Sequence, residues 1–160
     1  MLHIDIISVG SLRESYWKDA CQEYLKRNRK YYHLEMIEIR EELLPDAPSQ
    51  KQIEDSLEKE AERIKTSLKP SSYTIACSPK GNQFDSLQFA QMLQSLPLKG
   101  FSYCSFLIGG SWGMSSSLLE ACSQNLSFSE MTFPHQLFRL LLLEQLFRSA
   151  KINHHETYHK

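Results

Sequence analysis

Four stretches of the sequence contain residues that could bind a ligand or move a proton. The first is Gly109-Gly110-Ser111-Trp112-Gly113, where three glycines follow an apolar run. Glycine tolerates positive φ and lets the backbone approach a ligand closely. The spacing differs from G-x-G-x-x-G, and no Gly-Lys-Ser/Thr follows, which excludes a P-loop. The stretch is therefore equally typical of a ligand-binding loop and of a tight turn between a strand and a helix.

The second stretch is the end of the chain, His154-His155-Glu156-Thr157-Tyr158-His159-Lys160. No other His, Cys or Asp pattern has the spacing of metal ligands, so we expect no metal site. A polar tail of this kind is commonly disordered. Against disorder, Tyr158 can stack, His159 can move a proton near neutral pH and Lys160 can contact phosphate.

The third stretch runs from Tyr24 to His33 and contains four cations, three tyrosines and no acid. Interleaved cations and aromatic rings suit RNA, because they contact phosphates and stack on bases. The basic end of a helix, which complements the negative end of the helix dipole, would have the same composition. The sequence alone leaves both interpretations open.

The fourth stretch is an apolar segment at residues 134–150, which we predict to be the last helix. Its leucines at 140–143 face nearly every direction around a helix, so both sides should be buried. One side would meet a sheet and the other a second copy of the chain in a two-fold dimer. A helix buried within the monomer is the alternative. Arg139 and Arg148 could face phosphate, or Arg148 could pair with Glu144 four residues earlier.

The composition narrows the class of protein. With 160 residues the chain is long enough for one domain. Eighteen Lys and Arg against nineteen Asp and Glu leave a net charge of −1, which excludes binding of nucleic acid by bulk charge. The four cysteines never form CxxC, so we expect free thiols in a reducing compartment. Without a signal peptide or a long apolar run, we expect a soluble, cytoplasmic protein with no membrane contact.

The hydrophobic pattern predicts five strands that alternate with helices. Short apolar runs predict strands at 2–9, 34–39, 73–77, 103–108 and 128–133. Apolar residues at helical spacing predict helices at 13–30, 49–67, 84–96, 116–123 and 134–150, with Asp85 and Ser115 as N-caps. Such alternation is typical of a parallel sheet covered by helices on both faces. Ligands of these sheets bind at the carboxyl ends of the strands, here residues 77–82, 109–114 and 128–134.

Several motifs in combination resemble one family. They are Val9-Gly10, Tyr24-Leu25-Lys26-Arg27, Ile108-Gly109-Gly110-x-x-Gly113-Met114-Ser115, Leu126-Ser127-Phe128-Ser129-x-Met131-Thr132-Phe133-Pro134-His135-Gln136, Leu142-x-Glu144-Gln145-Leu146-Phe147-Arg148 and Tyr158-His159-Lys160. Over essentially its whole length the chain resembles the small bacterial SPOUT-class methyltransferases that modify N3 of a pseudouridine in 23S rRNA. The 126–136 string and the terminal triplet are specific only in combination.

The resemblance implies a single α/β/α domain over residues 1–160, with a deep trefoil knot near the C-terminus, and a homodimer. It also implies S-adenosylmethionine as the methyl donor, bound by the knot loops. By position, the cofactor would contact Cys77, Gly109, Phe128, Ser129, Glu130, Met131, Thr132 and Phe133. The catalytic residues would be Tyr158, His159, Lys160 and Arg139, with the chain's last residues completing the partner subunit's site.

The substrate would be 23S rRNA in the assembled ribosome, because a chain with net charge −1 should bind naked RNA poorly. The sulfonium methyl is already activated, so catalysis consists of placing N3 in line with it and removing the N3 proton. Neutral His159 could take this proton, and a water or hydroxide is the alternative. Lys160, Arg139 or Arg148 would offset the charge on the base, while Tyr158 would stack on it.

The chain departs from the family pattern in two places. Cys77-Ser78 and Gly81-Asn82 replace the usual Leu-Asp and Gly-Lys, and Phe147 replaces the usual Tyr. The lost acid and lysine affect RNA contact or dimer pairing more than cofactor binding. Two alternatives follow. One is a methyltransferase of the same fold that acts on another RNA, such as tRNA. The other is a non-catalytic ribosome-binding α/β dimer, which only the altered 78–82 loop supports.

Overall fold

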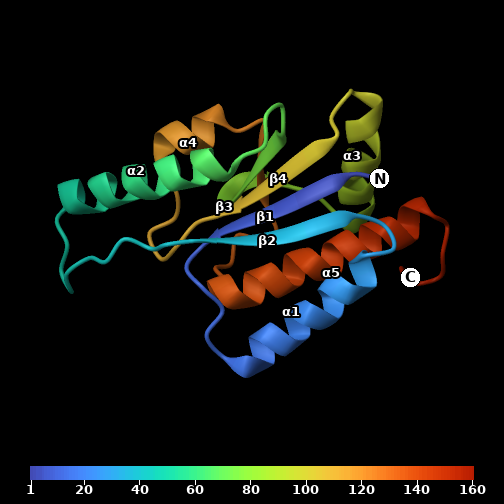
Figure 1. Cartoon of the computed structure of the whole chain (residues 1–160), viewed down its shortest axis with the longest axis horizontal. Helices are drawn as coiled ribbons and strands as arrows, with labels where there is room; N and C mark the ends of the chain where they lie inside the picture. The colour runs from blue at the N-terminus through green and yellow to red at the C-terminus, as the bar shows by residue number, and fades with distance from the viewer.

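The computed structural model describes residues 1–160 and has a five-stranded parallel sheet at its centre (Figure 1). The strand order is β2-β1-β4-β3-β5, so β2 and β5 form the two edges. The strands are β1 His3–Val9, β2 His33–Ile39, β3 Tyr73–Gln83, β4 Tyr103–Ile108 and β5 Gln124–Ser127. Because all five run parallel, their carboxyl ends meet at one end of the sheet.

Helices cover both faces of the sheet, which confirms the predicted α/β/α arrangement. The helices are α1 Ser15–Asn28, α2 Gln50–Ser67, α3 Ser86–Leu98, α4 Ser116–Ala121 and α5 His135–Asn153. Figure 1 shows α1 and α5 on one face and α2 and α4 on the other, and the two buried clusters assign α3 to the face of α1 and α5. No helix has both the length and the apolar character that a membrane span requires. The trefoil knot that the resemblance implies stays a prediction.

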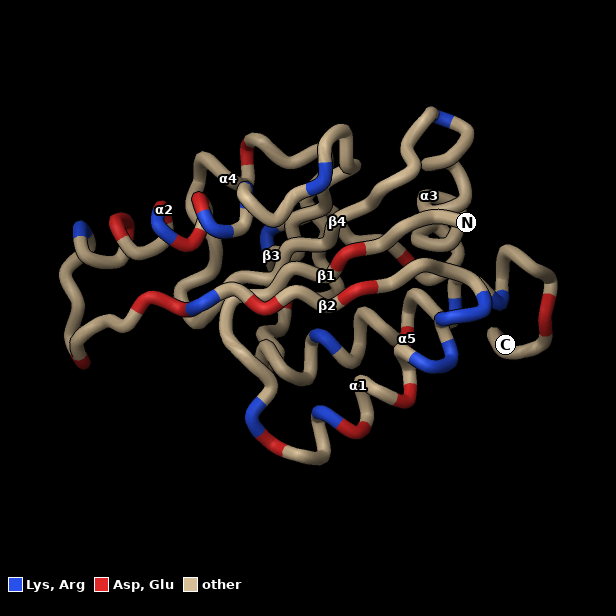
Figure 2. Tube along the Cα trace, in the orientation of Figure 1, with Lys and Arg blue, Asp and Glu red and all other residues tan.

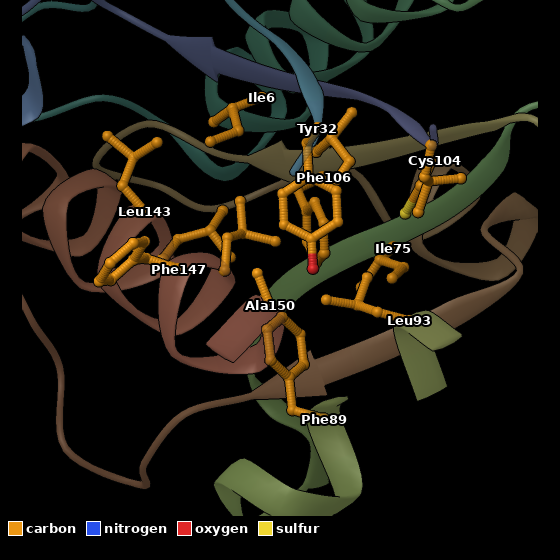
Figure 3. Packing of buried hydrophobic residues seen from close by; sticks show 14 of the residues in the cluster. Ile6, Tyr32, Ile75, Phe89, Leu93, Cys104, Phe106, Leu143, Phe147 and Ala150 are labelled. Carbon is orange, nitrogen blue, oxygen red and sulfur yellow. The ribbon is translucent and has the colours of Figure 1, made fainter. Parts of the chain in front are cut away.

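The two layers of core follow from the alternation of side chains along each strand. In β1, Ile6 enters the larger cluster under α1, α3 and α5, whereas Ile7 enters the smaller cluster under α2 and α4. Figure 3 shows Leu143 and Phe147 of α5 packed toward the strands that carry Ile6 and Phe106. Leu143 and Phe106 are fully buried, and each such side chain contributes about 1.5–3 kcal/mol.

Local sequence signals fix where the helices begin. Asp85 Oδ1 accepts a hydrogen bond of 2.7 Å from the backbone N–H of Gln88, and Ser115 Oγ accepts one of 3.2 Å from that of Leu118. Both predicted N-caps are therefore confirmed. The last helix continues to Asn153, three residues beyond its predicted end at 150.

The strand predicted at 128–133 is wrong. The fifth strand is Gln124–Ser127, where Leu126 pairs with Cys77 and then with Asn82 of β3. After Ser127 no partner strand continues, so the Phe-rich segment leaves the sheet, and Ser127 Oγ donates to the Ser129 carbonyl at 2.9 Å. A high β-propensity cannot make a strand without a neighbour to pair with.

The strand predicted at 73–77 is longer than expected, because the 78–82 loop is instead part of β3, which runs on to Gln83 across a register shift between Cys77 and Asn82. Gly81 makes this possible. A Cβ at position 81 would lie 2.6 Å from the backbone N of Leu126 and 2.7 Å from the carbonyl carbon of Asn125. The backbones of β3 and β5 therefore touch at a point where no side chain fits.

We expect Gly81→Ala to lower the free energy of unfolding by about 2 kcal/mol, because the added methyl must displace backbone and not a flexible side chain. Urea denaturation of the variant measures this loss. Lys80→Ala, at the exposed neighbouring residue, is the matched control and should unfold like the unaltered chain. If both variants unfold at the same midpoint urea concentration, β5 can move to accept the added methyl group, which would contradict a close backbone contact.

Candidate functional site

A cavity of about 280 Å³ lies where β4 and β5 end, beside the register shift of β3, and we name it the carboxyl-end cavity. It has the position expected for a ligand site in a parallel sheet. Its volume is close to the lower limit for small-molecule sites. It is lined by residues 77–79, 108–111, 113, 114, 119, 126–129, 131–133, 135 and 138.

The glycine loop after β4 is both a tight turn and a wall of this cavity. The N–H of Gly113 donates to the Gly110 carbonyl at 3.0 Å, and Gly113 has φ +81. A Cβ on Gly109 would lie 2.4 Å from the Gly113 carbonyl oxygen. The loop can therefore close only with glycine at position 109, and closing it leaves bare backbone facing the cavity.

The structure brings together seven of the eight residues predicted to contact the cofactor. Those that line the cavity are Cys77, Gly109, Phe128, Ser129, Met131, Thr132 and Phe133. Glu130 is exposed and does not line it. A side-chain hydrogen bond shapes the loop that follows β5, because Ser129 Oγ accepts from the backbone N–H of Met131 at 3.0 Å.

Sequence reasoning missed the cavity residues that come from helices, notably Leu119 of α4 and Phe138 of α5. The Phe138 ring lies 4.8 Å from that of Phe128, which in turn lies 6.2 Å from Phe89 of α3. These contacts hold Phe128 as an aromatic wall. The only sequence signal was that each helix begins directly after a loop of the site.

The electrostatics of the cavity are close to neutral. No Lys, Arg, Asp or Glu lines it. Two lining side chains have shifted pKa values. Burial raises the pKa of the Cys77 thiol, and burial together with the Arg139 charge lowers the pKa of His135. The imidazole is therefore uncharged at neutral pH and offers a hydrogen bond without a charge. This lining suits a ligand without phosphates.

Arg139 lies inside the protein, with only 1% of its surface exposed. Its Nη2 donates to the carbonyls of Gly10 at 2.9 Å and Val9 at 3.2 Å, and its Nη1 lies 3.3 Å from Glu38 Oε1. The guanidinium thus ties the ends of β1 and β2 to α5. Within one protomer it meets protein oxygens and not solvent, unlike the phosphate-facing side chain that the sequence suggested.

The tail folds back along the later part of α5, against residues 144–148, and is not disordered. Tyr158 Oη donates to Glu144 Oε1 at 3.1 Å, and its ring lies 5.0 Å from Phe147. The Arg148 guanidinium lies over that ring at 4.8 Å and also pairs with Glu144 at 2.6 Å, which confirms the predicted pair. His159 Nδ1 lies 3.4 Å from Arg148 Nη1. Burial and a hydrogen bond with Tyr24 raise the pKa of Tyr158 to about 12, so the phenol stays protonated.

Glu156 anchors this tail. It accepts hydrogen bonds from three side chains, namely Lys151, Tyr31 at 2.8 Å and Lys30 at 3.2 Å. The contact from Lys151, followed by those from the other two, lowers the pKa of Glu156 to about 2. Two of the donors belong to the basic stretch between α1 and β2, so part of that stretch positions the C-terminus.

One protomer does not bring the cavity and the tail together. The cavity lies at the start of α5, and the tail packs against residues 144–148 in the later part of the helix (Figure 1). From Phe138 in the cavity to Glu144 and Arg148 under the tail is about 9–15 Å along the helix axis at 1.5 Å per residue. Seven predicted cofactor residues and the three terminal residues therefore form two separate groups in a single chain.

Comparison with known proteins decides the family. The profile described as "Predicted SPOUT methyltransferase" matches residues 2–159. The chain belongs to the SPOUT methyltransferase family. The ribosomal RNA large subunit methyltransferase H of Clostridium acetobutylicum is 44% identical over 99% of this chain and 100% of its own length. The enzyme of that name from Natranaerobius thermophilus is 44% identical over 96% of this chain and 97% of its own length.

A solved structure supports the fold at much lower identity. "A probable methylase family protein" from Haemophilus influenzae superposes with a TM-score of 0.58 at 10% identity, over 95% of this chain and 66% of that one. This likeness concerns the fold alone. For a SPOUT methyltransferase, the methyl donor is of the S-adenosylmethionine type, and the uncharged, backbone-rich carboxyl-end cavity fits such a group.

We expect Glu156→Gln to release the tail at neutral pH, because the amide loses the charge that attracts both lysines. The heteronuclear ¹⁵N NOE of residues 157–160 measures this and should fall. In the unaltered chain the folded pKa lies below that of the unfolded chain, about 4.3. The anchor should therefore persist above that value and be lost as the pH falls toward 2.

Glu54→Gln, an exposed carboxylate on α2, is the control for the loss of one charge. It should leave the tail rigid. If the Glu156→Gln variant keeps the same NOE values as this control, the Glu156 contacts do not order the tail.

Proposed function

We propose that the protein transfers the methyl group of S-adenosylmethionine to N3 of a pseudouridine in 23S rRNA, acting as a cytoplasmic homodimer on the assembled ribosome. The observation that supports this best is the carboxyl-end cavity, in which seven residues expected to contact the cofactor meet without any ionised side chain. The names of the relatives favour large-subunit rRNA over tRNA as the substrate. They also favour an enzyme over a non-catalytic ribosome-binding dimer.

The residues of the cavity have distinct parts in holding the cofactor. When bound, S-adenosylmethionine supplies an already activated methyl group. Backbone groups of Gly109 and of residues 128–133 are the hydrogen-bonding partners, since glycine keeps that backbone accessible. Phe128, held by Phe138, supplies an apolar wall for the adenine. Glu130, which faces away from the cavity, would contact the cofactor only if its loop rearranges.

The distance between the cavity and the tail supports a dimer in which Tyr158, His159 and Lys160 serve the partner's cavity. A half-exposed apolar stripe on α5, Leu137 and Leu141, leads along the helix to Glu144 and Arg148. Residues at this spacing share one face of a helix. A second copy packed on this stripe would bury the apolar part and bring its tail toward the other cavity.

Within the tail, Lys160 and Arg148 are the cations available for the negative charge on the base and for phosphates. Tyr158 stays protonated and offers a stacking surface. Arg139 is a positioning residue, because its hydrogen bonds hold the ends of β1 and β2 beside the cavity. The tail is fixed by Glu156 before substrate arrives, which lowers the entropy lost on binding.

The proton on N3 must leave during transfer, and His159 is the candidate base. When Nδ1 accepts from Arg148, the proton of a neutral imidazole lies on Nε2. His159 can then accept a proton only after this contact opens, so substrate binding must separate the two side chains. A water or hydroxide remains the second candidate.

We expect His159→Ala to slow single-turnover methyl transfer by more than about tenfold, because the variant lacks the imidazole that would take the N3 proton. Rapid-quench measurements across pH 5–9 on ribosomes test this. A rate change below about tenfold would remove His159 from the role of base. Calorimetry with S-adenosylmethionine is the control and should give unchanged affinity.

A mixed dimer tests whether the site is shared between protomers. We combine Gly109→Ala, which fills the cavity wall, with a chain carrying His159→Ala and Lys160→Ala. Random pairing makes half of the dimers mixed, each with one intact composite site, so activity should return to about a quarter of the unaltered level. Each variant alone should be inactive, and an inactive mixture would show that the site lies within one chain.

A further inference from the structure

A second hollow of about 410 Å³ lies at the amino ends of β1, β2 and β4, and we name it the amino-end cavity. A strand of seven residues spans about 23 Å at 3.3 Å per residue, so this hollow lies far from the carboxyl-end cavity. None of the residues expected to bind the cofactor lines it. Its lining instead gathers aromatic rings, carboxylates and cations from segments far apart in the chain.

A row of three rings forms one part of the lining. His33, His3 and Tyr103 occupy matched positions on β2, β1 and β4. The His3 ring lies 4.5 Å from His33, stacked at 22°, and 4.9 Å from Tyr103. Because β2 is an edge strand and His33 is exposed, the outer face of its imidazole can continue the stack with another planar ring.

A row of carboxylates lies beside the rings. Glu35 and Asp5 follow His33 and His3 by two positions, which places them on the same face, and they pair across β2 and β1. Asp5 is only 5% exposed, lines the cavity, and has a buried Oδ2 with no hydrogen-bond donor. Burial, followed by the Glu35 charge, raises the pKa of Asp5. Such a group is destabilising until a donor reaches it.

Cations surround these carboxylates without neutralising them. Arg29 and Lys69 line the cavity, yet neither forms an ion pair with Asp5. Lys26 and Lys30 lie within one turn of Arg29, and Figure 2 shows this basic group where α1 turns into β2. Carboxylates alone would suit an amine, but this positive rim repels amines and attracts phosphate.

We propose that the amino-end cavity binds a guanosine nucleotide of an RNA strand. Guanine is the base that presents two adjacent donors, N1–H and the N2 amino group, to a carboxylate. Adenine and cytosine place an acceptor nitrogen beside their amino group, and uracil places its single N–H between two carbonyls. The base would stack on His33, present its donors to the Asp5 and Glu35 row, and leave its phosphates to Arg29 and Lys69.

This inference takes RNA as the ligand's source from the proposed function, but its test needs no methyl transfer. It also assigns the basic stretch at 26–30 a part in RNA contact besides anchoring the tail. A guanosine held here would fix the orientation of the RNA on the protein, because it lies about a strand's length from the carboxyl-end cavity.

Short labelled RNA strands test the proposal directly. Five-nucleotide strands carry one guanosine, inosine or adenosine among uridines, and fluorescence anisotropy with the full chain gives their affinities. We expect the guanosine strand to bind about tenfold more tightly than the adenosine strand, as hydrogen bonds to a charged acceptor allow. The inosine strand should fall between them, since inosine lacks the N2 amino group.

Variants test whether the amino-end cavity causes the preference for the guanosine strand. Asp5→Asn should reduce the guanosine preference to less than about twofold, and His33→Ala should weaken all three strands. Asp55→Asn, an exposed carboxylate on α2, is the matched control and should change nothing. If Asp5→Asn does not fold, ¹⁵N shift changes on adding GMP or AMP to the unaltered chain give the same answer at residues 3–5 and 33–35.

Two results would overturn the proposal. One is equal affinity for the guanosine and adenosine strands. The other is GMP binding as tightly as the guanosine strand, which would mean that the cavity takes a free nucleotide. Calorimetry of Asp5→Asn with S-adenosylmethionine measures binding at the carboxyl-end cavity. Loss of the guanosine preference and loss of methyl-donor binding are therefore observed separately.

Discussion

The packing of α5 across the parallel sheet is the contact on which the rest of the structure depends. Leu142, Leu143 and Leu146 are fully buried between the helix and the strands, and together they contribute several kcal/mol at about 1.5–3 kcal/mol each. A helix held along its whole length is a rigid spacer. It therefore fixes the carboxyl-end cavity at its first turn and the contacts of Tyr158 and His159 about two to three turns later, at residues 144–148.

This spacing explains why chemistry is divided between the two ends of the molecule. The carboxyl-end cavity contains backbone and apolar surface, which suits a donor without phosphates. The tail contains hydrogen-bonding and cationic groups organised by Glu144, Arg148 and Glu156, which suit an RNA substrate. In the proposed function the two ends act together, and two copies arranged around α5 would give a complete site.

Two ionic contacts support these ends, one made by the buried Arg139 and one by the half-exposed Glu156. Arg139 joins the carbonyls after β1 to α5, and its burial is tolerated because three oxygens surround it. Glu156 joins the tail to Lys30, Tyr31 and Lys151. Asp5 differs from both, since its buried Oδ2 has no donor and the residue lines the amino-end cavity, where a ligand could supply one.

The sequence predicted those features that depend on neighbouring residues. Asp85 and Ser115 cap helices through bonds three residues away, and the Gly109 loop is placed by the apolar strand before it. Sequence patterns failed where contacts between residues far apart in the chain determine the structure. Phe128–Phe133 has strand composition but no partner strand, and the burial of Arg139 depends on carbonyls about 130 residues earlier. Nothing near Glu156 in the sequence indicates its bond to Tyr31.

The separation of donor cavity and tail is the central claim, and a crystal structure with S-adenosylmethionine measures it most directly. We expect the methyl donor between Gly109 and the loop after β5, with His159 and Lys160 of a second copy at its mouth and α5 at the contact between copies. A ligand bound elsewhere, or copies that meet away from α5 with both tails far from either cavity, would contradict it.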